Sequence, residues 1–533
     1  MPTLNWIGKE GVVNHHLQVP FHLLKDVPDL ACGEPGDGNL IVQGDNLVAL
    51  KALVPYYAGQ VKCIYIDPPY NTGNENWVYN DNVNSPIIRE WLGKVVGKEG
   101  ETLDRHDRWL CMMYPRLALL RQFLRENGAI FVSIDDYEIE RLKLLMNEIF
   151  GEANHIATFI WKRRTTPDSR NLNGVSGDHE YVLCYQRSSG FRVTGQAKDL
   201  AKYSNPDNDP RGPWMSDNLT GLANAIERPN LHYDIIHPIT GERFKPHLSR
   251  GWIYGQDRML ELIKDNRLLW PRKAGGRPRL KRYLTDMQST TTGFSTVLKA
   301  PGNVEATKEL AEILGPKTFA FPKPSALVAL LIEQSTEPGD LVLDSFAGSG
   351  TTGHAVLRVN RAAKDREARR FILVEMEEAL ARQTTVERVR RVAEGYTNAS
   401  GKRVEGLGGG FRFCELGEPL FDENGKIREA VRFAELARHV YFSETGEPLP
   451  RERVTKAPFL GSCRGVGIYL LFNGILRDKK ANGGNVLTRA VLAELSPFDG
   501  PKVIYCAGCL LGKDRLQTER IIVRQTPYEI KVS

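Results

Sequence analysis

The sequence has no long apolar run and few cysteines for its length. No stretch approaches the roughly 20 apolar residues of a membrane-spanning helix, so we expect no membrane association. The first ten residues lack a basic segment followed by an apolar one, which predicts a cytoplasmic protein. Eight scattered cysteines in 533 residues are too few for a disulfide scaffold. Cys506-Ala-Gly-Cys509 has the spacing of half a zinc site, but no second pair completes it, so we expect no metal.

A strong charge of either sign is also missing. The formal net charge of +6 permits nucleic-acid binding without requiring it, so local basic clusters matter more than the total. Hydrophobic residues make up 41% of the chain and charged residues 26%, as in soluble globular proteins. A chain of 533 residues is too long for one ordinary core, and we expect two to four domains.

Most of the chain alternates predicted strands with predicted helices. The strands are expected at 39–43, 61–66, 129–134, 341–343 and 371–375, and the helices at 47–53, 108–125, 138–150, 327–333 and 353–359. The nearly continuous apolar character of the strands indicates burial on both faces of a parallel sheet. The alternation predicts a doubly wound α/β fold. From residue 163 to about 318, Pro, Gly and aromatic residues interrupt every periodic run, which predicts an inserted domain.

A first motif, Asp67-Pro68-Pro69-Tyr70, follows the apolar run 61–66. Ligands of open α/β sheets bind at this end of a parallel strand. The Asp67 carboxylate and the Pro68 carbonyl can each accept one N–H bond from an exocyclic amine, and the two prolines restrict the direction of the carbonyl. Tyr70 offers a ring on which a base can stack. Alone, these four residues also fit an ordinary Pro-Pro loop with a capping aspartate.

A second motif, Asp-Ser-Phe-Ala-Gly-Ser-Gly-Thr-Thr, occupies residues 344–352 after another apolar run. Gly348 and Gly350 permit a tight turn and close approach of a ligand before a helix begins. Glu375 ends the next strand, at the distance where an acid meets ribose hydroxyls in nucleotide-binding units. A phosphate-binding P-loop is excluded because Gly353 is followed by His354 instead of Lys. An ordinary glycine-rich turn is the alternative.

Together the two motifs resemble those of the β-class DNA amino-methyltransferases, and most closely the modification subunits of type III restriction-modification systems. In that family the catalytic motif, a target-recognition domain and the cofactor motif follow in this order, as they do here. Further similar segments are Gln43-Gly44-Asp45-Asn46-Leu47, the extension of the catalytic motif to Gly73, Phe321-Pro322-Lys323-Pro324, and Gly410-Phe411-Arg412 with Glu418-Pro419-Leu420. The resemblance covers residues 38–190 and 317–420 well, and the insert and tail match more loosely.

The resemblance implies a Rossmann-like S-adenosylmethionine-dependent methyltransferase core with an inserted target-recognition domain and a C-terminal α/β domain. The expected limits are an N-terminal extension at 1–38, the catalytic half of the core at 39–162, the target-recognition domain at 163–318, the cofactor half at 319–400 and a C-terminal interaction domain at 401–533. The implied catalytic residues are Asp67, Pro68, Pro69 and Tyr70. The implied cofactor-binding residues are Asp45, Asp67, Lys323, Asp344, Phe346, Gly348, Gly350, Thr351 and Glu375.

The same resemblance implies the reaction. N4-cytosine enzymes of the family typically carry Ser where this chain has Asp67, so we expect site-specific methyl transfer to N6 of a flipped-out adenine in double-stranded DNA. A homodimer and a separate restriction helicase-nuclease subunit are the implied partners. The alternatives are a catalytically inactive DNA-binding specificity subunit and a methyltransferase acting on cytosine N4 or on RNA.

Two basic clusters in or beside the insert are predicted to contact DNA, because Arg and Lys on irregular segments suit phosphate contacts. They contain Lys162, Arg163, Arg164, Arg272, Lys273, Arg277, Arg279, Lys281 and Arg282. A solvated charged surface is the alternative for both clusters.

Overall fold

The computed structural model describes residues 3–33, 38–72, 93–94, 104–168, 174–273, 275–363, 367–450, 457–472 and 484–526. The chain forms two compact units. Unit 1 contains Met1–Val193 and Ser295–Ser533, and unit 2 contains Thr194–Phe294. Unit 2 lies inside the predicted insert 163–318, and the two ends of that insert belong to unit 1.

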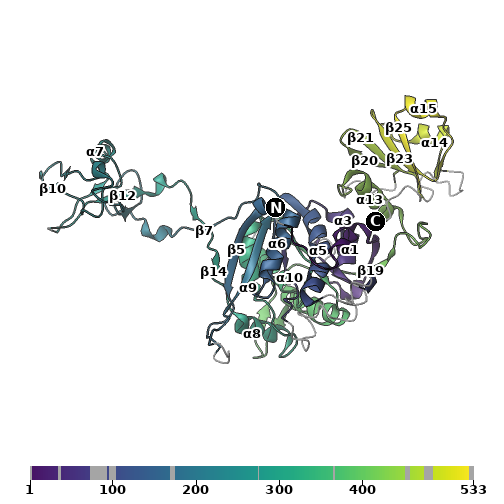
Figure 1. The fold of residues 1–533 in the computed structure, drawn as a ribbon, viewed down its shortest axis with the longest axis horizontal. Coiled ribbons are helices and arrows are strands. Elements are labelled where there is room, and N and C mark those ends of the chain that lie inside the picture. The colour runs from purple at the N-terminus through teal and green to yellow at the C-terminus, as the bar shows by residue number, and fades with distance from the viewer. Residues whose placement is uncertain are drawn as a thin grey trace. The chain divides into compact units, whose positions relative to one another are not determined.

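Unit 1 is built on a sheet of ten strands in the order β1-β19-β2-β16-β15-β3-β4-β6-β5-β14. Figure 1 shows the chain as a ribbon, with β5, β14 and β19 of this sheet labelled. The strands are β1 (His22–Asp26), β2 (Leu40–Gln43), β3 (Val61–Ile66), β4 (Leu124–Ile134), β5 (His155–Lys162), β6 (His179–Gln186), β14 (Val297–Leu298), β15 (Leu341–Asp344), β16 (Arg370–Glu375) and β19 (Arg412–Pro419). The six strands from β19 to β4 are parallel to one another, and β6 pairs with β4 in the antiparallel direction.

Helices pack on this sheet in two groups. One group comprises α3 (Asn46–Tyr57), α5 (Arg105–Phe123) and α6 (Ile139–Phe150), and the other comprises α9 (Ser325–Ser335), α10 (Thr351–Ala362) and α12 (Val386–Glu394). The core strands are almost wholly buried; Ile64, Leu343 and Ile372 have no exposed side-chain surface. This burial explains their apolar sequences and confirms the predicted doubly wound α/β core.

The strand order places the two motifs at one edge of the sheet. β3 and β15 are parallel neighbours, with Ile64 opposite Leu343. Asp67 and the segment 344–352 therefore follow adjacent strand ends, although they lie far apart in the sequence. From β3 the chain continues to β4 on one side, and from β15 it continues to β16 on the other side. The boundary between β3 and β15 is therefore the kind of switch point where α/β proteins bind ligands.

Four strands of the sheet lie outside the predicted core segments 39–162 and 319–400. These are β1, β6, β14 and β19. β19 pairs with β2 and with β1, so residues expected in the N-terminal extension and the C-terminal domain complete the sheet. Their sequences did not suggest core strands because polar or small residues interrupt them, such as Glu180 in β6 and Gly417 in β19.

The C-terminal part of unit 1 has its own four-stranded sheet, in the order β20-β21-β23-β25. The strands are β20 (Phe459–Cys463), β21 (Val466–Leu470), β23 (Lys502–Cys506) and β25 (Ile521–Gln525), and the helices α13 (Phe433–Thr445), α14 (Arg489–Glu494) and α15 (Lys513–Thr518) accompany them. The last three strands are parallel, which confirms the predicted small α/β region.

Unit 2 contains a three-stranded sheet, β11-β12-β8, and the helix α7 (Gln256–Lys264). The strands are β11 (Leu268–Leu269), β12 (Arg279–Tyr283) and β8 (Trp214–Asp217). A separate hydrophobic cluster that includes Trp252, Met259 and Leu280 forms its core. Within the described ranges of both units, no helix is long and apolar enough to cross a membrane.

Candidate active site

A buried lysine contacts both the Asp67 motif and the glycine-rich loop 344–352. Lys323 precedes α9, and its Nζ lies 2.9 Å from both carboxylate oxygens of Asp67. The same Nζ lies 3.3 Å from Oε2 of Glu180 in β6. The three side chains are 9%, 15% and 5% exposed, respectively. Buried charges of this kind are stable only when they are paired, so this group behaves as one unit.

Tyr70 belongs to the same group. Its hydroxyl donates to Glu180 Oε2 at 3.1 Å, and its ring centroid lies 4.7 Å from Lys323 Nζ. Burial, followed by the charges of Asp67 and Glu180, raises the pKa of Tyr70 well above its usual value, so the phenol stays neutral. Burial alone would lower the pKa of Lys323, but Asp67 and Glu180 raise it above its usual value, so the amine stays charged.

Glu180 is a site residue that the sequence analysis missed. It lies 110 positions after Tyr70, and only the pairing of β6 with β4 and β5 brings it to the site. Arg163, predicted to contact DNA, has its Nη1 3.3 Å from Glu180 Oε1. The only sequence signal was an isolated acid before the apolar run 181–184.

The backbone of the catalytic motif is fixed on both sides. Pro68 is buried, and the Pro69 carbonyl accepts a hydrogen bond of 2.6 Å from Trp109 Nε1. Asn71 has a left-handed φ of 58°, and its Nδ2 donates to Glu138 Oε1 at 2.5 Å. Burial raises the pKa of Glu138, while hydrogen bonds from Asn71 and His106 lower it. Gly73 of the extended motif lies outside the described residues.

The glycine-rich loop after β15 turns through left-handed backbone conformations, with φ of 52° at Gly348 and 79° at Gly350. The Gly348 N–H donates to Glu375 Oε2 at 2.9 Å, and its carbonyl accepts from Thr385 Oγ1 at 2.6 Å. A Cβ atom at Gly350 would lie 3.1 Å from the Thr385 carbonyl. The loop is therefore held between the end of β16 and the start of α12.

Asp344 stabilises the same loop through two hydrogen bonds. Its carboxyl oxygens accept hydrogen bonds from Phe346 N at 2.9 Å and from Thr352 Oγ1 at 2.5 Å. Burial raises the pKa of Asp344, these two hydrogen bonds lower it, and the charges of Asp67 and Glu375 raise it further. The resulting pKa is about 7. Phe346 itself packs against the central core.

Arg388 of α12 is a second residue that the sequence analysis missed. Its side chain is fully buried, and Nη1 donates to Ser349 Oγ at 2.9 Å and to Thr351 Oγ1 at 2.8 Å. Its Nη2 lies 3.3 Å from Glu309 Oε2. Burial lowers the pKa of Arg388 to about 10 and that of the adjacent His354 to about 3, so the arginine is the cation of this group. The Thr351 hydroxyl thus contributes to the support of the loop.

Asp45 caps α3 at the end of β2. Its Oδ1 accepts from Leu47 N at 2.9 Å and from Val48 N at 3.1 Å, and its Oδ2 lies 3.3 Å from the buried Arg116. Because β2 pairs with β16, Asp45, just after β2, and Glu375, the last residue of β16, lie at neighbouring strand ends. The side chain of Asp45 remains one-third exposed.

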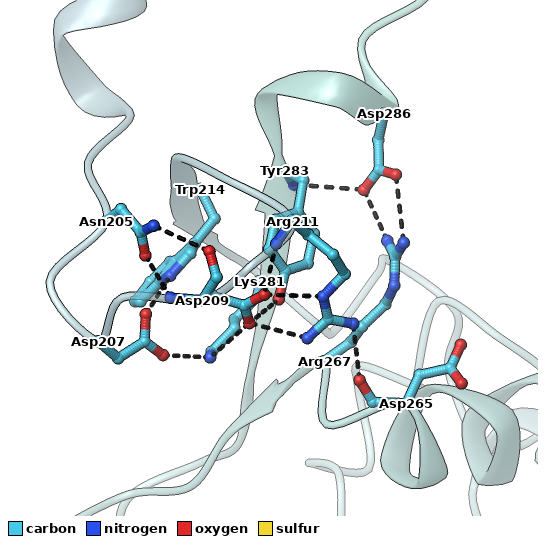
Figure 2. Close-up of polar contacts among 10 residues, drawn as sticks. All are labelled: Asn205, Asp207, Asp209, Arg211, Trp214, Asp265, Arg267, Lys281, Tyr283 and Asp286. Carbon is cyan, nitrogen blue, oxygen red and sulfur yellow. Dashed lines mark hydrogen bonds and ion pairs between the residues drawn. The ribbon is translucent and has the colours of Figure 1, made fainter.

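In unit 2, the predicted basic cluster divides into buried and exposed cations. Figure 2 shows Lys281 between Asp207 and Asp209, and its side chain is only 5% exposed. Tyr283 and Arg211 bind the same Asp209, at 2.5 and 2.8 Å from Oδ2. Lys281 therefore stabilises the fold of the unit. The exposed members of the cluster are Arg272, Lys273, Arg277, Arg279 and Arg282.

A cavity of about 980 Å³ lies within unit 2. Arg282 lines it, together with basic residues that the sequence analysis did not select: Lys198, Lys202, Arg258 and Arg267. In unit 1, Lys162 is exposed, and Arg164 is paired with Asp168 at 2.6 Å.

Comparison with known proteins identifies a family and relatives. The sequence profile described as DNA methylase matches residues 61–386. The StyLTI Mod subunit, a type III restriction-modification enzyme of Salmonella typhimurium, is 34% identical over 362 residues, covering 65% of this chain and 53% of that protein. The type III EcoP15I Mod subunit of Escherichia coli is 31% identical over 427 residues, covering 70% and 64%.

Among solved structures, the M1.HpyAVI-SAM complex aligns over 66% of this chain and 98% of its own, with a TM-score of 0.31 and 15% identity. The chain spans from about half to just under two thirds of the length of the two Mod subunits.

Proposed function

Because this chain belongs to the DNA methylase family, whose profile matches residues 61–386, we propose that it methylates N6 of adenine in double-stranded DNA. One observation carries the proposal. Asp67-Pro68-Pro69-Tyr70 and the glycine-rich loop 344–352 meet at the adjacent ends of β3 and β15, with Lys323 bound to Asp67 between them.

The residues around β15 fit S-adenosylmethionine as the proposed methyl donor. The buried Ser345 Oγ has no hydrogen-bond partner among the described residues, which suits a polar ligand at the loop. The carboxyl groups of Asp45 and Glu375 lie at the ends of the neighbouring strands β2 and β16, and their negative charge at this edge suits a positively charged sulfonium. That cofactor supplies an electrophilic methyl group. Lys323 is already bound to two carboxylates, which weighs against the cofactor contact expected for it.

The chain's own residues position the target base. We propose that the flipped-out adenine stacks on Tyr70, and that Asp67 and the Pro68 carbonyl each accept one N–H bond from its amino group. These bonds favour a pyramidal nitrogen with an available lone pair. The anchors at Pro69 and Asn71 hold these acceptors in place. Catalysis then rests on positioning and on exclusion of water, without a strong base.

For DNA binding we propose the cations of the unit 2 cavity and the exposed part of the basic cluster as phosphate contacts. The two relatives are named Mod subunits of type III restriction-modification enzymes. By analogy we propose that this chain acts in such a system, as a homodimer and with a separate restriction subunit.

The test is incubation of the purified chain with labelled S-adenosylmethionine and with either unmethylated genomic DNA or RNA, followed by nucleoside analysis. We expect label only in N6-methyladenine from DNA. Label in N4-methylcytosine or in RNA would contradict the proposed substrate. Tight DNA binding without label in any nucleoside would instead support a non-catalytic specificity subunit.

A further inference from the structure

The Lys323 ammonium group lies where the proposed reaction requires the amino group of the target. It binds both oxygens of Asp67, at 2.9 Å each, and lies 4.7 Å from the centre of the Tyr70 ring. The proposed function assigns that carboxylate and that ring to the adenine. The lysine and the base therefore compete for the same two partners.

The charge of Lys323 also opposes the chemistry. The attacking nitrogen becomes more positive as it gains the methyl group, and a cation bound directly to the carboxylate that accepts its N–H bond disfavours that change. An unneutralised Asp67 carboxylate stabilises it. The ammonium group must therefore leave Asp67 before methyl transfer.

Glu180 provides a second position for the cation. Its Oε2 already lies 3.3 Å from Lys323 Nζ, so a small movement of the side chain can break the contacts with Asp67 and keep the ion pair with Glu180, without leaving an unpaired cation in the interior. Pro322 and Pro324 restrict the backbone on both sides of Lys323, which leaves the flexible side chain to move.

We infer that Lys323 is a displaceable counter-ion that binds Asp67 and Tyr70, the proposed partners of the target adenine, until the adenine enters, and that it then moves to Glu180. Glu180 is thus a positioning residue of the reaction. This inference rests on the proposed function and assigns Lys323 and Glu180 a role in admitting the base.

The test uses the full chain and a duplex that contains its methylated motif, located by sequencing DNA that the chain has modified. The dissociation constant is measured for this duplex and for the same duplex with an abasic site at the target adenine. The ratio of the two constants reports how strongly the pocket prefers an adenine. The variants are Glu180→Gln, which keeps an acceptor for Tyr70 but removes the charge, and Lys323→Met. The exposed Glu152→Gln and Lys317→Met are the matched controls.

We expect opposite shifts in the two variants. Glu180→Gln removes the second position for the cation and should lower the preference for adenine about tenfold, or about 1.4 kcal/mol. Lys323→Met removes the competitor and should raise this preference. A purely structural role for the pair predicts that both variants lower it.

Calorimetry without DNA gives a second readout, because neither variant should change the affinity for S-adenosylmethionine more than twofold. A large loss of affinity in Lys323→Met would overturn the inference and assign the lysine to the cofactor. Shifts in the same direction, or an unchanged ratio, would overturn the inference alone. A wild-type chain that leaves adenine unmethylated would overturn the proposed function together with it.

Discussion

Replacing Asp344 by Asn should make unit 1 more stable than in the wild-type chain at alkaline pH. In the folded chain, burial raises the pKa of Asp344 to about 7, from 3.8 for an exposed carboxyl. The folded state therefore binds this proton more tightly than the unfolded state does. Its contribution to stability is fully present below about pH 4, decreases as the pH rises to about 7 and is then constant. The whole difference corresponds to about 4 kcal/mol.

The Asn variant lacks this dependence. Its amide oxygen still accepts from Phe346 N, and its amide nitrogen can donate to the Thr352 hydroxyl. We expect its advantage over the wild type to be about 3 kcal/mol larger at pH 8 than at pH 5. Hydrogen exchange at the amides of β15 measures this local free energy even if the chain unfolds in several steps. If the stability advantage of the variant does not change with pH, the raised pKa of the buried Asp344 carboxyl is refuted.

Three further predictions concern the cofactor, DNA and assembly. Gly348→Leu should lower the affinity for S-adenosylmethionine at least tenfold in calorimetry, because a bulky side chain strains the left-handed φ of 52° at the loop. Neutralising Lys202 and Arg282 should reduce the log–log salt slope of DNA binding by about 0.9 for each lost phosphate contact. By contrast, Lys281→Met should lower the melting temperature of the chain, because it removes a buried cation from its ion pairs with Asp207 and Asp209. Light scattering should give twice the chain mass of 59.9 kDa, and a mass of one chain would contradict the homodimer.

The sequence predicted the buried centre of the sheet more completely than its sides. β3, β15 and β16 are apolar except at or next to their ends, so their pattern identifies them without tertiary information. β6 and β19 lie nearer the edges, where polar residues are tolerated, and residues such as Glu180 and Glu415 interrupt their patterns. Only the pairing with β4 and β2 shows that these segments belong to the core sheet.

The same limit applies to the candidate site. Two short motifs predicted Asp67, Tyr70 and Gly348 as candidates, because within each motif the residue types that the chemistry requires lie close together in the sequence. Glu180 and Arg388 contact the site from distant elements, and nothing local distinguishes them from other charged residues. In unit 2, a run of basic residues did not reveal which cation the fold would bury.

The substitution Asp67→Ala tests most directly whether this site performs the proposed reaction. We measure the turnover of methyl transfer to DNA and, in parallel, the affinity for S-adenosylmethionine. We expect turnover to be abolished and cofactor affinity to be largely retained, because Asp67 acts on the reacting amino group. A folded variant with more than about a tenth of wild-type turnover, a loss below about 1.4 kcal/mol, would contradict the catalytic role of Asp67.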